Sequence, residues 1–289
     1  MSEKEIDSVT NVETTGHEWD GIKELNNPLP RWWVYVFYAT IVFSIGYAVY
    51  YPAIPLIEGA TQGISGETTR GQLHEEMAAV EAGRADMLEQ IRGMEVGEIP
   101  ANPELARFAS AGGASAFKVY CSQCHGSGAQ GAAGYPNLND DDWLWGGSIE
   151  QIAATIRHGV RYEADGDTRW SEMPAFGRDQ LLPREDILAV AHYVRSLSGL
   201  EHDRGAMDEG ARVYAENCAA CHGEDGLGNT DLGAPNLADA LWLYGDSQQE
   251  IVSQINNPKH GVMPAWGERL GDAVVKQLAV YVHGLGGGE

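Results

Sequence analysis

Two short stretches share one pattern that decides the fold: residues 119–126 read VYCSQCHG and residues 217–223 read NCAACHG. They contain all four cysteines of the chain, in two copies of Cys-x-x-Cys-His. Such paired thiols serve disulfide redox chemistry, form half of a zinc site, or make two thioether bonds to a haem. The histidine after each pair favours haem, because its imidazole is then held under the ring, where it binds the iron axially.

The two other uses of paired thiols fit less well. A zinc site needs four ligands in one tetrahedron, whereas each copy here carries its own histidine. A thioredoxin-like site would need a βαβ pattern, which surrounds neither copy. The sequence therefore predicts two covalently bound haem c groups, attached through Cys121 and Cys124 and through Cys218 and Cys221, with His125 and His222 as proximal iron ligands.

Each copy is followed by a methionine in matching surroundings, Met173 in SEMPAFG and Met263 in GVMPAWG. A single methionine usually fills a core, but two Met-Pro-Ala-aromatic-Gly matches indicate distal iron ligands, which raise the haem potential. Sequence spacing leaves open whether each methionine ligates the haem of its own repeat or the two are exchanged. The rival ligands, which would give bis-histidine haems, are His158, His192, His260 and His283.

The two halves of the chain that carry these motifs are one fold used twice. GGASAFKVYCSQCHG aligns with GARVYAENCAACHG, and YPNL aligns with APNL. Each copy closes with a short amphipathic segment that carries Tyr193 or Tyr281, and we expect it to pack on the helix that carries Phe117 or Tyr214. The first copy alone has an insertion, residues 161–172, whose acidic and glycine-bearing composition predicts an exposed loop.

The N-terminal part reads differently. Residues 32–51, WWVYVFYATIVFSIGYAVYY, contain no charge and as a helix would cover about 30 Å, the thickness of the bilayer hydrocarbon. A cleaved signal peptide is disfavoured, because the 31 preceding residues contain seven acids against three bases and no clean cleavage site follows. The bases Lys4, Lys23 and Arg31 precede the span and the next is Arg70, which predicts a cytoplasmic N-terminus and periplasmic haem domains.

The predicted fold class is mainly α, with one N-terminal transmembrane helix and two tandem class I cytochrome c domains. The predicted parts are a cytoplasmic segment (1–31), a transmembrane helix (32–54), a periplasmic linker with an amphipathic helix (55–101), and cytochrome c domains at 102–204 and 205–289. The linker helix would lie on a partner or the membrane surface, or pack on its own haem domain. Its apolar positions at helical spacing are Leu73, Met77, Val80, Met87, Ile91 and Met94.

The formal net charge of −23 excludes nucleic acid as a partner. The acidic surface would steer a basic electron donor or simply keep the chain soluble, and both interpretations stay open. The acidic run Asp140, Asp141 and Asp142 favours a solvated turn over a metal site. No pattern indicates catalysis, and an iron with a methionine on its sixth position has no open site for oxygen or peroxide.

The stretch GHEWDGIKELNNPLPRWW, the single span, the linker helix and two Cys-x-x-Cys-His domains ending in MPAF and MPAW resemble the dihaem cytochrome c subunit of cbb3-type cytochrome c oxidases. The resemblance implies an electron-transfer subunit, not catalytic by itself, in the bacterial inner membrane. It implies as partners a cytochrome c donor, a monohaem cytochrome subunit and the haem-copper subunit that reduces oxygen and pumps protons. It assigns the cysteines, histidines and methionines above the same haem-binding roles. The alternatives are a freestanding membrane-tethered electron shuttle and a dihaem peroxidase or gas sensor.

Overall fold

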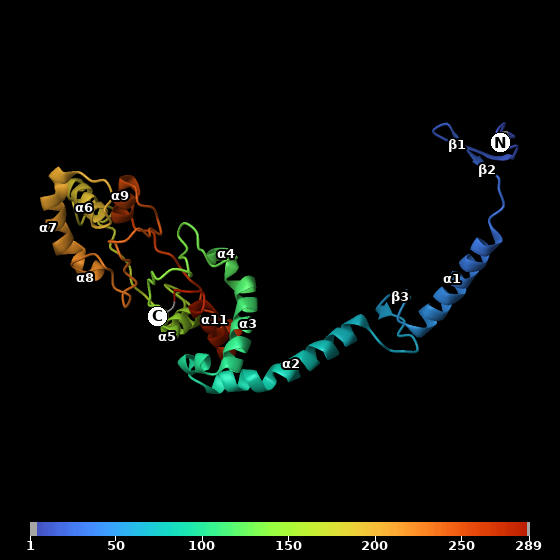
Figure 1. Cartoon of the computed structure of the whole chain (residues 1–289), viewed down its shortest axis with the longest axis horizontal. Helices are drawn as coiled ribbons and strands as arrows, with labels where there is room; N and C mark the ends of the chain where they lie inside the picture. Colours follow the sequence, from blue (N-terminus) through green and yellow to red (C-terminus); the bar gives the residue numbers. More distant parts are fainter. Residues whose placement is uncertain (1–4, 288–289) are drawn as a thin grey trace. The chain divides into compact units, whose positions relative to one another are not determined.

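The computed structural model describes residues 5–287 and is mainly helical, as the sequence predicts. It divides into two compact units, one up to Gly83 and one from Arg84 onward. The boundary falls inside a long helix, α2 (Thr69–Gly93), and each unit is described by itself. Figure 1 shows the order of the elements along the chain.

The N-terminal unit begins with an antiparallel hairpin of β1 (Thr14–Trp19) and β2 (Ile22–Leu25), closed by Asp20 and Gly21 with positive φ. Such a turn suits Asp-Gly, because both residues tolerate the left-handed backbone region. A second short hairpin, β3 (Pro55–Leu56) with β4 (Gly59–Ala60), follows the first long helix.

That helix, α1 (Arg31–Tyr50), is the one described helix long and apolar enough to span a membrane. Pro30 precedes it, and Tyr51 ends it in an extended conformation. The helix is therefore shorter at its C-terminal end than the predicted span 32–54. Its large apolar side chains are exposed, as a surface surrounded by lipid requires.

Helix α2 uses its apolar positions in two ways. Toward its C-terminal end Ile91 is fully buried, and Met87 packs against the same core. Toward its N-terminal end Leu73, Met77 and Val80 are about half exposed. The last turns thus pack on the C-terminal unit, while the earlier turns leave an apolar stripe uncovered in the described chain.

The C-terminal unit contains the two repeats. A short 3-10 helix, η1 (Val96–Ala101), leads to the first, and Asn102 caps the next helix by accepting hydrogen bonds from the backbone of Glu104 and Leu105. The first repeat contains α3 (Pro103–Tyr120), α4 (Ser122–His125), α5 (Ile149–His158) and α6 (Arg184–Leu197). The second contains η2 (Arg204–Ala206), α7 (Met207–Asn217), α8 (Ala219–His222), α9 (Gln248–Asn256), α10 (Gly267–Leu270) and α11 (Asp272–His283).

The packing of these helices does not follow the order of the repeats. Helix α11, the last of the chain, packs against α3 and α5 of the first repeat, whereas α6 packs against α7 and α9 of the second (Figure 1). Two hydrophobic cores result. We call them lobe 1 (α3, α4, α5, α10 and α11) and lobe 2 (α6, α7, α8 and α9). Each lobe combines both repeats, so the two lobes do not coincide with the domains predicted at 102–204 and 205–289.

Glycines at matching positions allow the close helix contacts in both lobes. A Cβ on Gly113 in α3 would lie 2.1 Å from the carbonyl oxygen of Gln277 in α11. In lobe 2, a Cβ on Gly210 would lie 2.4 Å from the carbonyl oxygen of Ala189 in α6. Both glycines stand eight residues before the first cysteine of their motif. The same helix crossing is therefore built twice, each time between the two repeats.

The exchange takes place where two connecting segments cross. The segment after α5 runs toward α6 in lobe 2, and the segment after α9 runs toward α10 in lobe 1. They meet at Val160 and Met263, whose backbones exchange two hydrogen bonds of 2.9 and 3.0 Å. The insertion 161–172 belongs to this crossover, and the prediction of an exposed loop is wrong at Arg161 and Arg169, which are half-buried.

Candidate functional site

Each Cys-x-x-Cys-His motif forms one tight helical turn. Cys121 ends α3 and begins α4, and the backbone N–H of His125 donates to its carbonyl oxygen at 3.0 Å. The second motif repeats this geometry, with His222 donating to Cys218 at 3.0 Å. The two thiols and the imidazole of each motif are thereby gathered on one short element, as attachment of one haem requires.

Each motif histidine is oriented by a backbone carbonyl. The Nδ1 atoms of His125 and His222 lie 3.1 Å from the carbonyl oxygens of Pro136 and Pro235, respectively. A carbonyl can only accept, so Nδ1 donates and Nε2 is left with the lone pair that binds a metal. Burial lowers the pKa of both imidazoles, partly opposed by the carbonyl contact, and so favours the neutral ligand form.

The role of these proline carbonyls was not predicted from the sequence. The signal was present, because Pro-Asn-Leu follows both motifs, at Pro136 and again at Pro235. A pattern of hydrophobic and polar residues cannot reveal a backbone acceptor. The repeated proline marks a loop whose conformation brings its carbonyl to the imidazole in both lobes.

The state of the thiols argues against disulfide redox chemistry. All four cysteines are free in the described chain. Burial, with a smaller contribution from the neighbouring cysteine, raises the pKa of Cys121 to about 11 and that of Cys218 to about 11. A redox-active cysteine instead needs a lowered pKa to form the nucleophilic thiolate.

Each methionine lies in the core of the lobe that contains the Cys-x-x-Cys-His motif of the other repeat. Met263, from the second repeat, packs in the core of lobe 1 together with Cys121. Met173, from the first repeat, packs in the core of lobe 2 together with Cys218. The fold therefore brings Met263 to the motif of His125 and Met173 to the motif of His222. Sequence spacing alone had left both pairings open.

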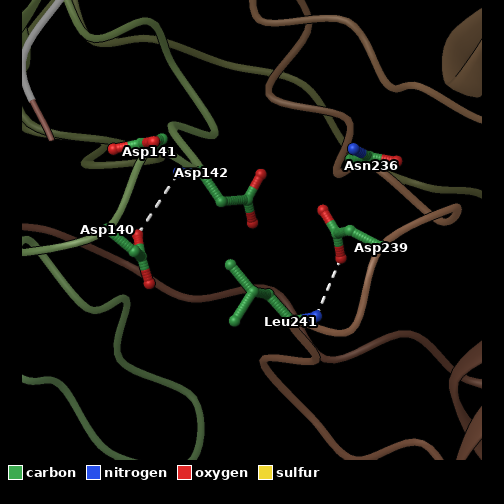
Figure 2. A pocket seen from close by; sticks show the side chains of 6 residues that line it. All are labelled: Asp140, Asp141, Asp142, Asn236, Asp239 and Leu241. Atoms are coloured by element: carbon green, nitrogen blue, oxygen red, sulfur yellow. Dashed lines mark hydrogen bonds between the residues drawn. The ribbon is translucent and has the colours of Figure 1, made fainter.

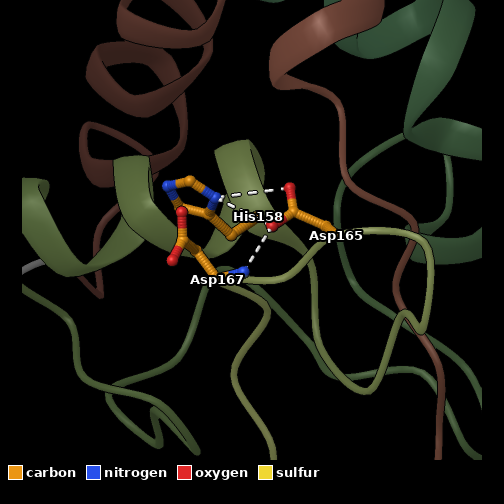
Figure 3. A group of neighbouring side chains, drawn as sticks. All are labelled: His158, Asp165 and Asp167. Atoms are coloured by element: carbon orange, nitrogen blue, oxygen red, sulfur yellow. Dashed lines mark hydrogen bonds and ion pairs between the residues drawn. The ribbon is translucent and has the colours of Figure 1, made fainter.

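Three of the four rival histidines have other hydrogen-bond partners. His192 Nδ1 accepts from the backbone of Asp203 at 3.2 Å, and His260 Nε2 accepts from the backbone of Met173 at 3.2 Å. His158 Nδ1 lies 3.2 Å from a carboxylate oxygen of Asp165, which also accepts from the backbone of Asp167 (Figure 3). His283 also takes part in an interaction. His158 and Asp165 thus fix the shape of the crossover, and His260 holds the backbone of Met173.

The acidic run lines an open depression. Figure 2 shows the carboxylate of Asp142 facing Asp239 of the second repeat, with Asp140 beside them. Burial, followed by repulsion from Asp239 and then Asp140, raises the pKa of Asp142 to about 6. The acidic turn predicted within the first repeat therefore lies beside Asp239, a carboxylate of the second repeat.

The donors that lack a partner fit the carboxylates of a haem. Among the described residues, the buried side-chain donors without an acceptor are Arg161 Nε and one of its terminal nitrogens, and Trp242 Nε1. Trp143 occupies the equivalent position in the first repeat, and its Nε1 donates to the carbonyl of Gly287. A haem supplies two propionates that accept hydrogen bonds, and the rest of the donor set, with thiols, neutral imidazoles and thioethers, also fits haem c.

Two family models match the chain. The N-terminal domain of cytochrome oxidase-cbb3, FixP, matches residues 11–58, and cytochrome c oxidase, cbb3-type, subunit III, matches residues 109–194 and 205–282. The cytochrome match implies haem c as the cofactor. The two matched ranges each contain one Cys-x-x-Cys-His motif.

Similar proteins cover the chain almost completely. The cbb3-type cytochrome c oxidase subunit FixP of Sinorhizobium medicae (strain WSM419) is 59% identical over 99% of this chain and 98% of that protein. Subunit FixPc of Rhizobium leguminosarum bv. viciae is 53% identical over 100% of both chains. Subunit CcoP of Cereibacter sphaeroides is 51% identical over 96% of this chain and 95% of that protein.

Proposed function

Because the chain belongs to the cbb3-type cytochrome c oxidase subunit III family, FixP or CcoP, we propose that it is the dihaem electron-transfer subunit of such an oxidase. One observation supports this proposal most strongly. In each lobe, a Cys-x-x-Cys-His turn whose imidazole is oriented by a carbonyl packs in the same core as a methionine. We propose two haem c groups per chain, one in each lobe.

Haem c supplies one-electron chemistry, its iron alternating between the ferric and ferrous states. The chain would hold each haem by two thioether bonds, at Cys121 and Cys124 in lobe 1 and at Cys218 and Cys221 in lobe 2. His125 with Met263 and His222 with Met173 would be the axial ligand pairs. A thioether ligand favours the ferrous state, so these pairs suit an electron carrier of high potential.

With both axial positions filled, the chain would pass electrons without binding oxygen. It would accept one electron at a time from a cytochrome c donor and pass it toward the monohaem cytochrome and haem-copper subunits. The packed methionines Met263 and Met173 support this role over a dihaem peroxidase, which needs a labile sixth ligand.

Helix α1 would hold the subunit in the bacterial inner membrane. The bases Lys23 and Arg31 on its N-terminal side support a cytoplasmic N-terminus, with both lobes in the periplasm. The uncovered stripe of Leu73, Met77 and Val80 on α2 supports contact with partner subunits close to the membrane.

The test is purification of the full chain from its native membrane in mild detergent. We expect co-purification with a haem-copper subunit, two haems per chain that resist acidified-acetone extraction, and the weak far-red absorption of methionine-ligated ferric haem. Haem released by the solvent would contradict covalent attachment. A dihaem chain that purifies without an oxidase would instead identify the freestanding shuttle.

A further inference from the structure

One half-buried cation among the described residues, Arg161, has side-chain donors that lack an acceptor. Arg161 is the first residue after Val160, whose backbone pairs with Met263 in the crossover. Two nitrogens of its guanidinium, Nε and one terminal nitrogen, are buried without a hydrogen-bond partner. Burial of an unpaired charge is costly, so its presence indicates that a group with acceptors normally lies there.

The neighbouring arginine shows the contrast. Arg161 and Arg169 both lie 5.8 Å from the ring centre of Trp145. Arg169 donates to the backbone carbonyl oxygens of Trp145 and Gln151 and is therefore satisfied. Arg161 contributes only its backbone N–H, which donates to the carbonyl of Arg169 at 2.8 Å. The two arginines share one aromatic ring but differ in whether their donors are used.

No carboxylate within the described residues forms an ion pair with Arg161. Burial lowers the pKa of its guanidinium. The electrostatic effects of Tyr244 and then Glu172 partly oppose this shift, without an ion pair. A guanidinium has five donors in a planar fork that matches the two oxygens of a carboxylate. The missing acceptor should therefore be a carboxylate.

Arg161 lies at the seam between the two repeats, where residues of both pack against each other. Its aromatic neighbour Trp145 comes from the first repeat, and a Cβ on Gly233 of the second would lie only 2.3 Å from the Trp145 ring. Tyr244, the second-repeat counterpart of Trp145, also affects the pKa of Arg161 electrostatically. The guanidinium is thus enclosed by both repeats, beside the backbone of the methionine that packs in lobe 1.

We propose that Arg161 binds a haem propionate in this seam and thereby raises the potential of that haem. This inference rests on the proposed function, since it requires haem in the lobes. A positive charge beside the haem disfavours the ferric state, which carries one more positive charge than the ferrous state. The insertion 161–172, present only in the first repeat, would then give the two haems different potentials.

The test uses the full chain with both haems attached and compares three variants by spectroelectrochemical titration. Arg161→Gln removes the charge and should reduce the equilibrium constant for reduction of one haem on the order of tenfold, about 59 mV for a one-electron couple. Arg161→Lys keeps the charge and should retain most of the parent potential. Arg178→Gln is the matched control, because Arg178 is exposed and already paired with Asp179, and it should leave both potentials unchanged.

Unchanged potentials in Arg161→Gln, with both haems bound and methionine-ligated, would overturn the inference. An equal shift in Arg178→Gln would also overturn it, because the effect would then not depend on where the lost charge lies. If Arg161→Gln fails to fold, redox-difference infrared spectra of the parent and Arg161→Lys, with haem isotopically labelled at the propionate carboxyls, give a second readout. A moved carboxylate band supports the contact, and identical bands refute it. A parent chain without covalent haem would instead refute the proposed function.

Discussion

The ring of Phe117 in α3 packs against the ring of Tyr281 in α11, with centres 5.5 Å apart, although the two residues belong to different repeats. The counterpart pair, Tyr193 and Tyr214, has centres 5.1 Å apart in lobe 2. Each pair joins the helix that enters one motif to the helix that follows the methionine of the other repeat. The exchange of helices and the placement of the methionines are therefore one structural feature.

The first prediction concerns the axial ligands. In a Cys218→Ala, Cys221→Ala chain, which keeps only the haem attached at Cys121, Met263→Ala should abolish the far-red ferric band and lower the haem potential. Met173→Ala in the same background should leave both unchanged, because Met173 packs in lobe 2. Absorption spectra and redox titration of the two variants provide the measurement.

The reciprocal background is the control. A chain without Cys121 and Cys124 should respond to Met173→Ala and not to Met263→Ala. If the haem in each single-haem chain instead changes when the methionine of its own repeat is replaced, the axial ligands are not exchanged. The packing of a methionine in a lobe would then not indicate which haem it ligates.

The second prediction tests the helix crossing in lobe 1. Gly113→Ala should reduce the free energy of unfolding by about 1–3 kcal/mol, because the added methyl group would meet the backbone of Gln277. Gly83→Ala in α2 is the matched control, since a Cβ there meets nothing within 4 Å, and it should be neutral or stabilising by up to about 1 kcal/mol. Denaturant unfolding followed by circular dichroism measures both. Equal effects would show that the close approach of α3 and α11 does not constrain position 113.

The third prediction concerns the end of the linker helix. The ammonium of Lys276 in α11 is almost fully buried and donates to the carbonyl oxygens of Ile91, Arg92 and Met94 at 3.3, 2.9 and 2.7 Å. Lys276→Met should cost about 2–3 kcal/mol of stability, because these acceptors lose a charged donor. Hydrogen exchange should also rise at the end of α2.

Lys118→Met, at an exposed position of α3, removes the same charge and is the control. It should leave both the unfolding free energy and hydrogen exchange near the parent values. A Lys276→Met chain as stable as Lys118→Met would mean that solvent satisfies the carbonyls at the end of α2.

The fourth prediction is a dependence of stability on pH. The folded-state pKa of Asp142 is raised to about 6 from its ordinary 3.8, so the folded chain binds this proton more tightly than the unfolded chain. The stability contributed by the proton is fully present below about pH 4 and is lost as pH rises to about 6. Asp142→Asn should remove this loss and raise the melting temperature at pH 7 relative to the parent.

Thermal unfolding at several pH values between 4 and 7 checks this expectation. Asp141→Asn, at the exposed neighbouring position, is the control and should follow the parent profile. If Asp142→Asn loses stability over the same interval and by the same amount as the parent, Asp142 is not the group that makes stability depend on pH, and its burial beside Asp239 does not raise its pKa enough to matter.

Local features of the fold could be predicted from the sequence. The membrane-length apolar run forms α1, and aromatic residues of the terminal helices pack in pairs, as expected. The identity of each partner could not be predicted, because the repeats present similar surfaces and either helix satisfies the same hydrophobic pattern. The choice depends on the path of the crossover at Val160, which is a long-range property.

Side-chain environments at the site were harder to predict than the motifs. Cys121, His125 and Met263 could be singled out by spacing and neighbouring residues. Arg161 could not, because the composition of its loop indicates exposure, and burial against Trp145 depends on residues far away in the sequence. Pro136 acts through its backbone carbonyl, and the repeated Pro-Asn-Leu marks the loop without revealing that role.

The exchange of closing helices has a consequence for biogenesis. The chain is made from its N-terminus, so Cys121, Cys124 and His125 emerge well before Met263 and α11, which complete their lobe. Under the proposed function, haem would be attached to the first motif while that lobe still lacks its closing helix and Met263. Lobe 1 therefore reaches its final form only when α11 has been made, and a product that ends before Met263 leaves lobe 1 without both this methionine and its closing helix.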